Sequence, residues 1–266
     1  MAEYNEAADV AEHANKVGVL MEYVRYLGHP TSGYKLGLDI GGGLGGHAPW
    51  LLGITERLYV ADVIPFSSVL DGRLPFEFSN KCKRYDINVD LANIEFHQVD
   101  GRKLIYRDNL FDFVFSINAF EHIPEPRRAL NEIIRVTKPG ALVVIQFDPT
   151  WYSAYGSHLW GFDVDPWCHL LLSDQEMEAE IKRKGGTDQD VFNFRNDMNH
   201  VPFSTFRDMF EKPSPDFFRT SNFSYWSMDV ESDPYAAHPN FKKCLELGYP
   251  KEDLLARGVQ FIGIRA

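Results

Sequence analysis

Apolar residues recur every three to four positions from Ala7 to Leu27. That spacing is typical of one face of an α-helix, so the first 28 residues are predicted to form an amphipathic helix with a break near Gly18. The glycines and the proline that follow, from Gly28 through Pro30, predict its end.

Short apolar runs further along the chain predict β-strands. They lie at residues 35–40, 58–61, 94–99, 111–117, 141–147 and 259–264. Between the fourth and fifth runs, the segment "PRRALNEIIRVTKPG" predicts a helix that begins at Pro126 and ends at Lys138-Pro139-Gly140. Strands that alternate with helices are typical of parallel crossover connections, so we expect an open α/β sheet with helices on both faces.

The alternation of strands and helices lapses between Pro149 and Pro215. This segment opens with the aromatic-rich stretch "WYSAYGSHLWGFDVDPWCHL". A long insertion of this kind is either a cap over an active site or a packing elaboration, and the concentration of aromatic and histidine residues favours a cap. Beyond it the pattern predicts a helix at 204–210, a strand at 218–228 and a helix at 241–256, with the last two strands forming an antiparallel pair.

A single domain is therefore expected over residues 1–266, because 266 residues with 44% apolar composition can bury one substantial core. Its expected parts are an N-terminal helical segment (1–34), a core (35–149), a cap (150–215) and C-terminal elements that complete the sheet (216–266).

The charge balance argues against polyanionic partners. The chain carries 27 basic and 38 acidic residues, a net charge of -11, which repels nucleic acid and anionic membranes over most of the surface. We therefore expect a small-molecule partner rather than a nucleic acid or a membrane, and the sequence carries no signal for an oligomeric state.

The cysteines and the N-terminus bear on location. Cys82, Cys168 and Cys244 are far apart and form no C-x-x-C pair, which argues against a disulfide framework or a structural zinc site. The first residues are too charged for a signal peptide, and no apolar run reaches the roughly 18 residues that span a bilayer. A cytoplasmic location is the prediction.

The stretch "LDIGGGLGG" fits two ligand-binding patterns. Gly41, Gly43 and Gly46 fit the G-x-G-x-x-G of a dinucleotide site. Asp39, with the glycines at 41, 43 and 45, fits the D-x-G-x-G-x-G pattern of an S-adenosylmethionine site. A carboxylate at Asp39 would repel a pyrophosphate but suits an ammonium group, such as the one on the methionine end of S-adenosylmethionine. The sequence therefore favours S-adenosylmethionine as the cofactor.

Two further acidic positions indicate a nucleoside. Asp62 ends the second predicted strand, where a carboxylate can accept hydrogen bonds from both ribose hydroxyls. Asp100-Gly101 follows the third strand and is placed to meet the adenine amino group, although an ordinary turn explains it as well.

With these features in order, the chain resembles class I S-adenosylmethionine-dependent methyltransferases of the small-molecule type. The matching segments are "LDIGGGLG", "VAD", "QVDG", "FDFVFSINAFEHI" and "RALNEIIRVTKPGALVVI", which cover residues 35 to 147. The resemblance implies a Rossmann-like seven-stranded sheet, mostly parallel with an antiparallel last strand, and a cofactor at the carboxyl ends of the first four strands. Two departures are the glycine-richer loop, which leaves the dinucleotide pattern open, and the long aromatic segment after the fifth strand.

The resemblance also implies cofactor contacts at particular residues. The glycines at 41, 43 and 45 would line the methionine moiety, Asp62 the ribose, Asp100 and Gly101 the adenine, and Asn118 the region beside the sulfonium. The full cofactor set is Asp39, Gly41, Gly43, Gly45, Asp62, Val63, Asp100, Gly101, Asn118 and Ala119.

Methyl transfer from a sulfonium is an in-line displacement that mainly needs alignment of the acceptor and exclusion of water. A hydroxyl acceptor also benefits from a base within hydrogen-bond reach. The candidates are His122 in "FEHI", His158 and His169 in the aromatic segment, and Asp148 just past the fifth strand, where it can orient a hydroxyl or bind an amine. A purely structural role is the alternative for each histidine.

No metal site is predicted. His158, Asp163, Asp165 and His169 are suitable ligand types, but their spacing matches no established metal motif.

The sequence thus predicts an S-adenosylmethionine-dependent methyltransferase that acts on a small molecule, with a hydroxyl of a sugar-like or natural-product intermediate as the acceptor. An N-methyltransferase acting on a small amine is the main alternative. More remote alternatives are an NAD-dependent oxidoreductase and a non-catalytic methyltransferase-like protein.

Overall fold

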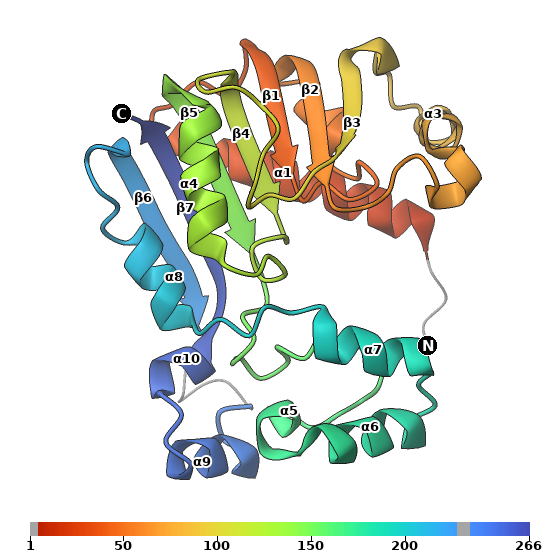
Figure 1. Ribbon diagram of the computed structural model, residues 1–266, viewed down its shortest axis with the longest axis vertical. Coiled ribbons are helices and arrows are strands. Elements are labelled where there is room, and N and C mark those ends of the chain that lie inside the picture. The colour runs from red at the N-terminus through yellow and green to blue at the C-terminus, as the bar shows by residue number, and fades with distance from the viewer. Residues whose placement is uncertain (1–4, 228–234) are drawn as a thin grey trace.

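The fold is built around a seven-stranded sheet (Figure 1). The structure is a computed structural model, which describes residues 5–227 and 235–266. The strands are β1 (Tyr34–Ile40), β2 (Thr55–Asp62), β3 (Ile94–Gln98), β4 (Phe111–Ile117), β5 (Thr137–Phe147), β6 (Phe218–Ser227) and β7 (Ala256–Arg265). Their order across the sheet is β3-β2-β1-β4-β5-β7-β6. Strands β1 to β5 pair in parallel, and β7 is antiparallel to both β5 and β6, which confirms the predicted topology.

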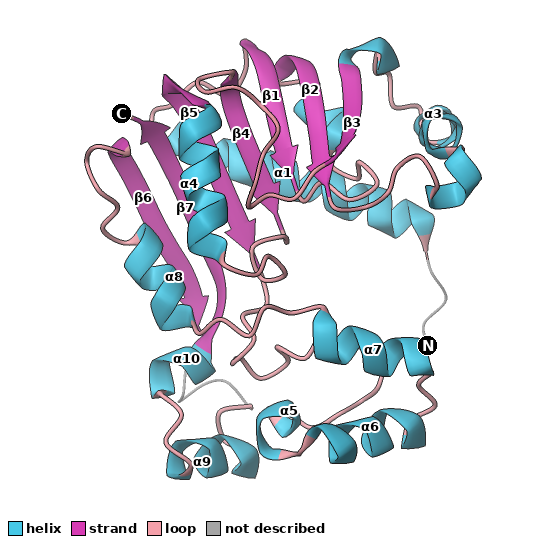
Figure 2. Ribbon diagram, viewed as in Figure 1, coloured by secondary structure: helices cyan, strands magenta, loops and turns pink. Residues whose placement is uncertain are grey.

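Helices cover both faces of the sheet, as predicted (Figure 2). The helices of the described residues are α1 (Glu6–Tyr26), α2 (Ala48–Leu51), α3 (Leu74–Arg84), α4 (Pro126–Val136), α5 (Cys168–Leu171), α6 (Asp174–Arg183), α7 (Asp188–Asn196), α8 (Phe203–Phe210), α9 (Pro239–Glu246) and α10 (Lys251–Leu255), with short 3₁₀ turns η1 (Val69–Gly72) and η2 (Leu91–Asn93). One buried cluster joins α4 and α8 to the sheet, and a second joins α1, α2 and α3 to the opposite face. Since successive side chains of a strand point to opposite faces, Leu38 and Ile40 enter the first cluster, whereas Asp39 points toward the second face.

The apolar pattern located the elements better than it located their ends. Helix α1 continues through Gly18, because the buried residues Val17, Leu20 and Met21 hold that turn against the sheet. Helix α4 ends at Val136, so the predicted helix end at Lys138-Pro139-Gly140 is wrong and these residues belong to β5. Tertiary pairing decides this boundary, because Thr137 already pairs with β4.

The predicted helix over 241–256 is also wrong, since two helices occupy that region. Gly248 separates α9 from α10 with a φ of +91°, which favours glycine, and Pro250 prevents the helix from continuing across the turn. The predicted strand at 218–228 is found as β6, although its last residue, Met228, lies outside the described residues.

The insertion between β5 and β6 contains its own helices and its own buried cluster. Helices α5, α6 and α7 lie past the carboxyl ends of the parallel strands, below the arrowheads of β4 and β5 in Figure 1. Capping boxes at Ser173 and Thr187 begin α6 and α7. Trp151 and Phe194 are among the buried residues beneath them.

Within the described ranges, no helix is both long enough and apolar enough to cross a membrane.

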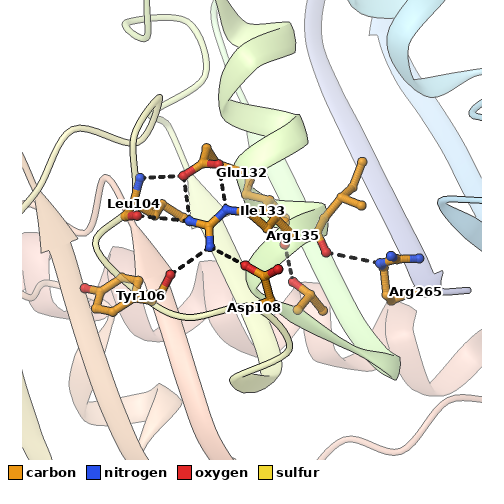
Figure 3. Close-up of polar contacts among 9 residues, drawn as sticks. Leu104, Tyr106, Asp108, Glu132, Ile133, Arg135 and Arg265 are labelled. Atoms are coloured by element: carbon orange, nitrogen blue, oxygen red, sulfur yellow. Dashed lines mark hydrogen bonds and ion pairs between the residues drawn. The ribbon is translucent and has the colours of Figure 1, made fainter.

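The guanidinium of Arg135, in the last turn of α4, fixes the segment that leads from β3 to β4 (Figure 3). It donates to Glu132 and Asp108 at 2.7–2.8 Å and to the backbone carbonyls of Leu104 and Tyr106 at 3.0 and 2.8 Å. Glu132 in turn accepts the backbone N–H of Leu104 at 2.8 Å. This network ties α4 to a segment that begins just after Gly101.

Replacing Arg135 with Met should lower the free energy of unfolding by about 1–3 kcal/mol, because two carbonyls and two carboxylates lose a charged donor. Arg128→Met is the matched control on the same helix, since Arg128 is exposed and its contact with Glu125 spans 4.0 Å, so its loss should cost about 0–0.5 kcal/mol. Denaturant unfolding measures both values, and equal losses in the two variants would contradict the role assigned to Arg135.

Candidate functional site

Two cavities open where the parallel strands end, on either side of the glycine loop. The α1 cavity, about 680 Å³, lies between that loop, α1 and α3. The Asp62 cavity, about 300 Å³, lies between the ends of β1 and β2 and the loops after β3 and β4. Gly41 and Asn118 line both cavities, so the two meet at these residues.

Most of the predicted cofactor residues line these cavities. Gly41, Gly43, Gly45 and Asn118 line the α1 cavity. Gly41, Asp62, Val63, Asp100, Gly101, Asn118 and Ala119 line the Asp62 cavity. Of the predicted set, only Asp39 lines neither.

The loop after β1 requires glycine at its closest approaches. Gly41 has a φ of +69°, and a Cβ atom there would lie 2.2 Å from the Cβ of Ala119. At Gly42 a Cβ would lie 2.5 Å from a carboxylate oxygen of Asp39. The loop therefore lies directly on the Asp39 side chain and against the loop after β4.

Asp39 is fully buried beneath this loop. Neither carboxylate oxygen has a hydrogen-bond partner among the described residues. Burial, together with the nearby carboxylate of Asp62, raises the pKa of Asp39 to about 8. A buried carboxylate without a counter-charge is costly, so this end of the sheet is suited to a ligand that brings positive charge.

Asn118 adds a second polar atom in need of a partner. Its Oδ1 is buried and has no partner in the described part of the chain, and the residue lies where the two cavities meet. Its φ is +49°, in the left-handed region that asparagine tolerates better than most residues.

Asp62 is held in place by backbone donors. One carboxylate oxygen accepts the N–H of Gly43 at 2.9 Å, and the other accepts the N–H of Ile64 at 3.1 Å. Since a carboxylate has about four acceptor positions, both oxygens can still accept a hydroxyl from the cavity.

Asp100 is engaged more completely. The side chain of Arg102 donates to both carboxylate oxygens at 2.7–3.1 Å, and its backbone N–H donates to one of them at 2.8 Å. These hydrogen bonds lower the pKa of Asp100. An adenine amino group would therefore have to share this carboxylate with Arg102.

Helix α1 closes the far side of the α1 cavity. His13 lies against the glycine loop, with its ring 4.6 Å from the ring of His47. Ion pairs from Asp9 to Lys81 at 2.8 Å and from Glu6 to Arg84 at 3.0 Å join α1 to α3. The sequence indicated the helix but not that it forms a wall of the site, because these partners are more than 70 residues apart.

Among the predicted catalytic residues, His122 and His158 are brought together from distant segments. Their rings lie 5.1 Å apart; His122 lines the Asp62 cavity, whereas His158 lines neither cavity. His122 donates from Nδ1 to the backbone carbonyl of Asp197 at 2.8 Å, and burial lowers the pKa of His122. The Nδ1 of His158 lies 3.9 Å from the Asp197 carboxylate.

Glu121 is a neighbour of this pair that the sequence analysis did not select. Its side chain is 1% exposed, and both carboxylate oxygens lack a partner among the described residues. Burial raises the pKa of Glu121 well above its usual value, and Asp148 contributes to that rise. Burial also raises the pKa of Asp148. The signal that was available is an ionisable residue within the apolar run "INAFEHI".

His169 lies away from both cavities. It is buried at α5, donates from Nε2 to the carbonyl of Trp151 at 2.8 Å, and packs edge-on against that indole. Burial lowers the pKa of His169 to about 4, so the ring is neutral. Its contacts hold the insertion together. The aromatic residues of the stretch at 151–167 also line neither cavity, and Trp151 and Trp167 belong to buried clusters.

Asn199 fastens the insertion to the site. Its side chain donates to the carbonyls of Phe120 and Ile123 at 2.6 and 2.9 Å, and its backbone N–H donates to the carbonyl of Glu121 at 2.8 Å. No local pattern predicted this residue, because its partners are 76 or more residues away.

Comparison with known proteins agrees with this geometry. A family described as a methyltransferase domain matches residues 38–145, which hold both the glycine loop and the loop after β4. Residues 38–145 form a class I methyltransferase domain. Enzymes of this class use S-adenosylmethionine as the methyl donor.

Relatives of the methyltransferase domain are similar over short stretches. An uncharacterised methyltransferase of Mycobacterium leprae is 39% identical over 66 residues, 25% of this chain and 24% of that protein. One from Mycobacterium tuberculosis is 38% identical over 90 residues, 34% of this chain and 33% of that protein. The match thus spans about a quarter to a third of these curated relatives.

Solved structures share the fold across most of the chain. A candidate sarcosine dimethylglycine methyltransferase from Galdieria sulphuraria has a TM-score of 0.51 at 14% identity, covering 94% of this chain and 85% of that one. Phosphoethanolamine N-methyltransferase 2 from Haemonchus contortus, in complex with S-adenosyl-L-methionine, has a TM-score of 0.50 at 16% identity, covering 94% of this chain and 52% of that one.

The site of the methyltransferase domain fits S-adenosylmethionine. The glycine loop leaves space that any Cβ at Gly41 would fill, and Asp39 supplies negative charge with no protein partner among the described residues. Asp62 retains acceptor positions for ribose hydroxyls. A pyrophosphate would instead face two carboxylates, those of Asp39 and Asp62.

Cofactor binding should release a proton from Asp39 below pH 8. In the free protein the raised pKa keeps this carboxyl mostly protonated there, and a bound cation favours the ionised form. Affinity should therefore strengthen as the pH rises from 6 toward 8, by up to about one log unit per pH unit, and then level off.

Isothermal titration in buffers of different ionisation enthalpy measures this proton release. The Asp39→Asn variant should bind S-adenosylmethionine at least about 10-fold more weakly and lose the released proton. Proton release that is the same in wild type and variant would assign the titration to another group.

Proposed function

We propose that the protein transfers a methyl group from S-adenosylmethionine to a small-molecule acceptor where the two cavities meet. The observation that carries this proposal is the pairing of a buried, uncompensated Asp39 with a glycine loop that forms the boundary of both cavities. When bound, this cofactor supplies an activated methyl group, and its sulfur retains the electron pair of the bond that breaks. The chain's own residues then have to hold the ligands, align them and exclude water.

The proposed cofactor contacts follow from the two cavities. Asp62 would accept the ribose hydroxyls, and the segment at Asp100-Gly101 would border the adenine in the Asp62 cavity. The buried Oδ1 of Asn118 would face the junction of the two cavities, where it can accept a hydrogen bond from an ammonium group or contact a polarised methyl group. Asp39 would act through the loop, without direct contact, as a carboxyl group that loses its proton when the cationic cofactor binds.

The proposed acceptor is a hydroxyl on a polar, sugar-like compound. The α1 cavity is the larger of the two and is bordered by ionisable side chains of both signs rather than by the aromatic residues of the insertion. These side chains are Glu6, Asp9, Lys16, Glu77, Lys81 and Arg84. Hydroxyl groups can exchange hydrogen bonds with such a surface.

A hydroxyl acceptor has to give up its proton, and His122 is the proposed base. It borders the Asp62 cavity, and its lowered pKa leaves the ring neutral at pH 7, as a base requires. Because its Nδ1 donates to the carbonyl of Asp197, Nε2 carries the free lone pair. His158 and Asp148 are the proposed supporting residues on the same side.

An amine acceptor is a second candidate, favoured by a different observation. Carboxylates of Glu121, Asp148 and Asp197 surround the histidine pair, and such a surrounding attracts a cationic amine.

The insertion at residues 150–215 is proposed to act as a cap. Asn199 and Asp197 attach it to the loop after β4, so a movement of the insertion would open or cover the Asp62 cavity. The three cysteines are free and buried, which is compatible with a reducing compartment, and we propose the cytoplasm.

Replacing Asp62 with Ala should weaken cofactor binding by about 1–3 kcal/mol, because two ribose hydroxyls would lose a charged acceptor. The Asp188→Ala variant is the control, since the Asp188 side chain is exposed on α7 and neither it nor its chain neighbours line either cavity. Calorimetric titration with S-adenosylhomocysteine measures the difference. Unchanged affinity in Asp62→Ala would remove this residue from the cofactor site.

Incubation with methyl-labelled S-adenosylmethionine and separate panels of hydroxylated and amine compounds tests the activity itself. Label should move to a hydroxylated compound, and transfer to amines alone would favour the second candidate. Cofactor binding without transfer to either panel would contradict the proposed activity and favour a non-catalytic role.

A further inference from the structure

Three potential metal ligands converge beside the Asp62 cavity. One ligand atom from each of Glu121, His122 and His158 lies within 4.8 Å of the other two. Nε2 of His122 lies 3.9 Å from Oε1 of Glu121. These residues come from the loop after β4 and from the insertion, 36 residues apart, so no short sequence motif contains them.

The histidines are oriented by groups behind them. Nδ1 of His122 donates to the carbonyl of Asp197, which leaves Nε2 as the free lone pair on the side of Glu121. Nδ1 of His158 lies 3.9 Å from the Asp197 carboxylate. Metal-binding histidines usually donate their other ring N–H to a carbonyl or carboxylate, because that contact fixes the tautomer and the ring orientation. His122 makes such a bond, and the ring of His158 faces the same residue at a longer distance.

Glu121 provides an independent indication of a ligand. Its side chain is 1% exposed, and neither oxygen has a partner within residues 5–227 or 235–266. The positive charge of Lys16 acts to lower the pKa of Glu121, but the ammonium group of Lys16 forms its ion pair with Glu12. A buried carboxylate with both oxygens unpaired, directed at two imidazoles, lacks a positively charged partner.

We propose that Glu121, His122 and His158 bind a divalent transition-metal ion. Two imidazoles and one carboxylate are a ligand set that suits zinc, with the fourth position open to an exogenous oxygen. Neighbouring ligands of a tetrahedral zinc ion lie about 3.3 Å apart, given bond lengths of about 2.0 Å. From separations of 3.9 Å and up to 4.8 Å, the ligand atoms would therefore need to close by about 0.6 to 1.5 Å on binding.

This site departs from the sequence analysis, which predicted no metal site and weighed a different group of residues. His169 is buried at α5 and bonded to Trp151, and Asp163 is exposed beside Lys184. Only His158 belongs to both groups. Spacing along the chain was uninformative because the insertion folds back onto the loop after β4.

The position of the ion suggests its use, which rests on the proposed methyl transfer. With the ion bound, Nε2 of His122 is a ligand and no longer a free base, so the ion takes the place of His122 in activating the acceptor hydroxyl. His122 lines the Asp62 cavity next to Asn118 and Ala119, so an oxygen in the open position would lie close to the proposed methyl donor. A bound divalent ion lowers the pKa of a coordinated hydroxyl and holds it in place. The acceptor that this site recognises is thus a hydroxyl. The ion selects it over an amine because the ion lowers the pKa of a coordinated hydroxyl.

Titration of the full-length chain with zinc after removal of metal by a chelator tests the proposal directly. One ion should bind per chain, and replacing zinc with cobalt should give visible absorption bands typical of a tetrahedral site. Neither readout requires methyl transfer, so failure of the metal site and failure of the proposed activity are distinguishable.

Matched variants locate the ion. Glu121→Gln keeps the size of the side chain, and His158→Asn suits the left-handed backbone at that residue, where φ is +58°. Each should weaken zinc binding by about 10–100-fold and remove the cobalt bands. His29→Asn, on the loop after α1, is the control and should bind zinc as the wild type does. Unchanged binding of S-adenosylhomocysteine would show that the variants remain folded.

Two results would overturn the proposal. One is a wild-type chain that binds no zinc at concentrations up to about 1 mM. The other is binding that survives both Glu121→Gln and His158→Asn, which would place the ion elsewhere on the chain.

Discussion

The site depends on a buried carboxyl group, that of Asp39, beneath a loop that only glycine can form. Asp39 points away from the cluster that contains Leu38 and Ile40, and the loop that follows crosses directly over its carboxylate at Gly42. The loop can lie this close because residues 41 and 42 have no side chains. The sheet thus holds a carboxyl group without a counter-charge beneath the loop that borders both cavities. Its ionisation is costly in the unliganded protein and is favoured when a cationic ligand binds.

The same constraint explains how the surrounding loops are arranged. Gly43 donates to Asp62, so the first loop sets the position of the carboxylate at the end of β2. Ala119 contacts the space that a Cβ at Gly41 would occupy, so the loop after β4 is fixed against the first. That loop continues into Glu121 and His122, which meet His158 from the insertion. The proposed cofactor residues and the proposed catalytic residues therefore share one continuous framework.

The sequence predicted this framework wherever local pattern and ligand chemistry coincide. Short apolar runs, glycines and strand-end carboxylates are local signals, and they located the parallel strands, the glycine loop and Asp62. Boundaries were less predictable where tertiary pairing decides them, as at Thr137, which leaves helix geometry in order to pair with β4. Residues whose meaning depends on distant partners were not predictable. Glu121 becomes notable only once its burial is known, and Asn199 only once its bonds across 76 or more residues are seen.

The most direct test of the central claim is calorimetric titration of the unmodified chain with S-adenosylhomocysteine and, separately, with NAD. A pocket built around Asp39 predicts that one S-adenosylhomocysteine binds per chain and that NAD, with its pyrophosphate, does not bind measurably. Binding of NAD without binding of S-adenosylhomocysteine would contradict the assignment of this charge, and with it the cofactor and the reaction.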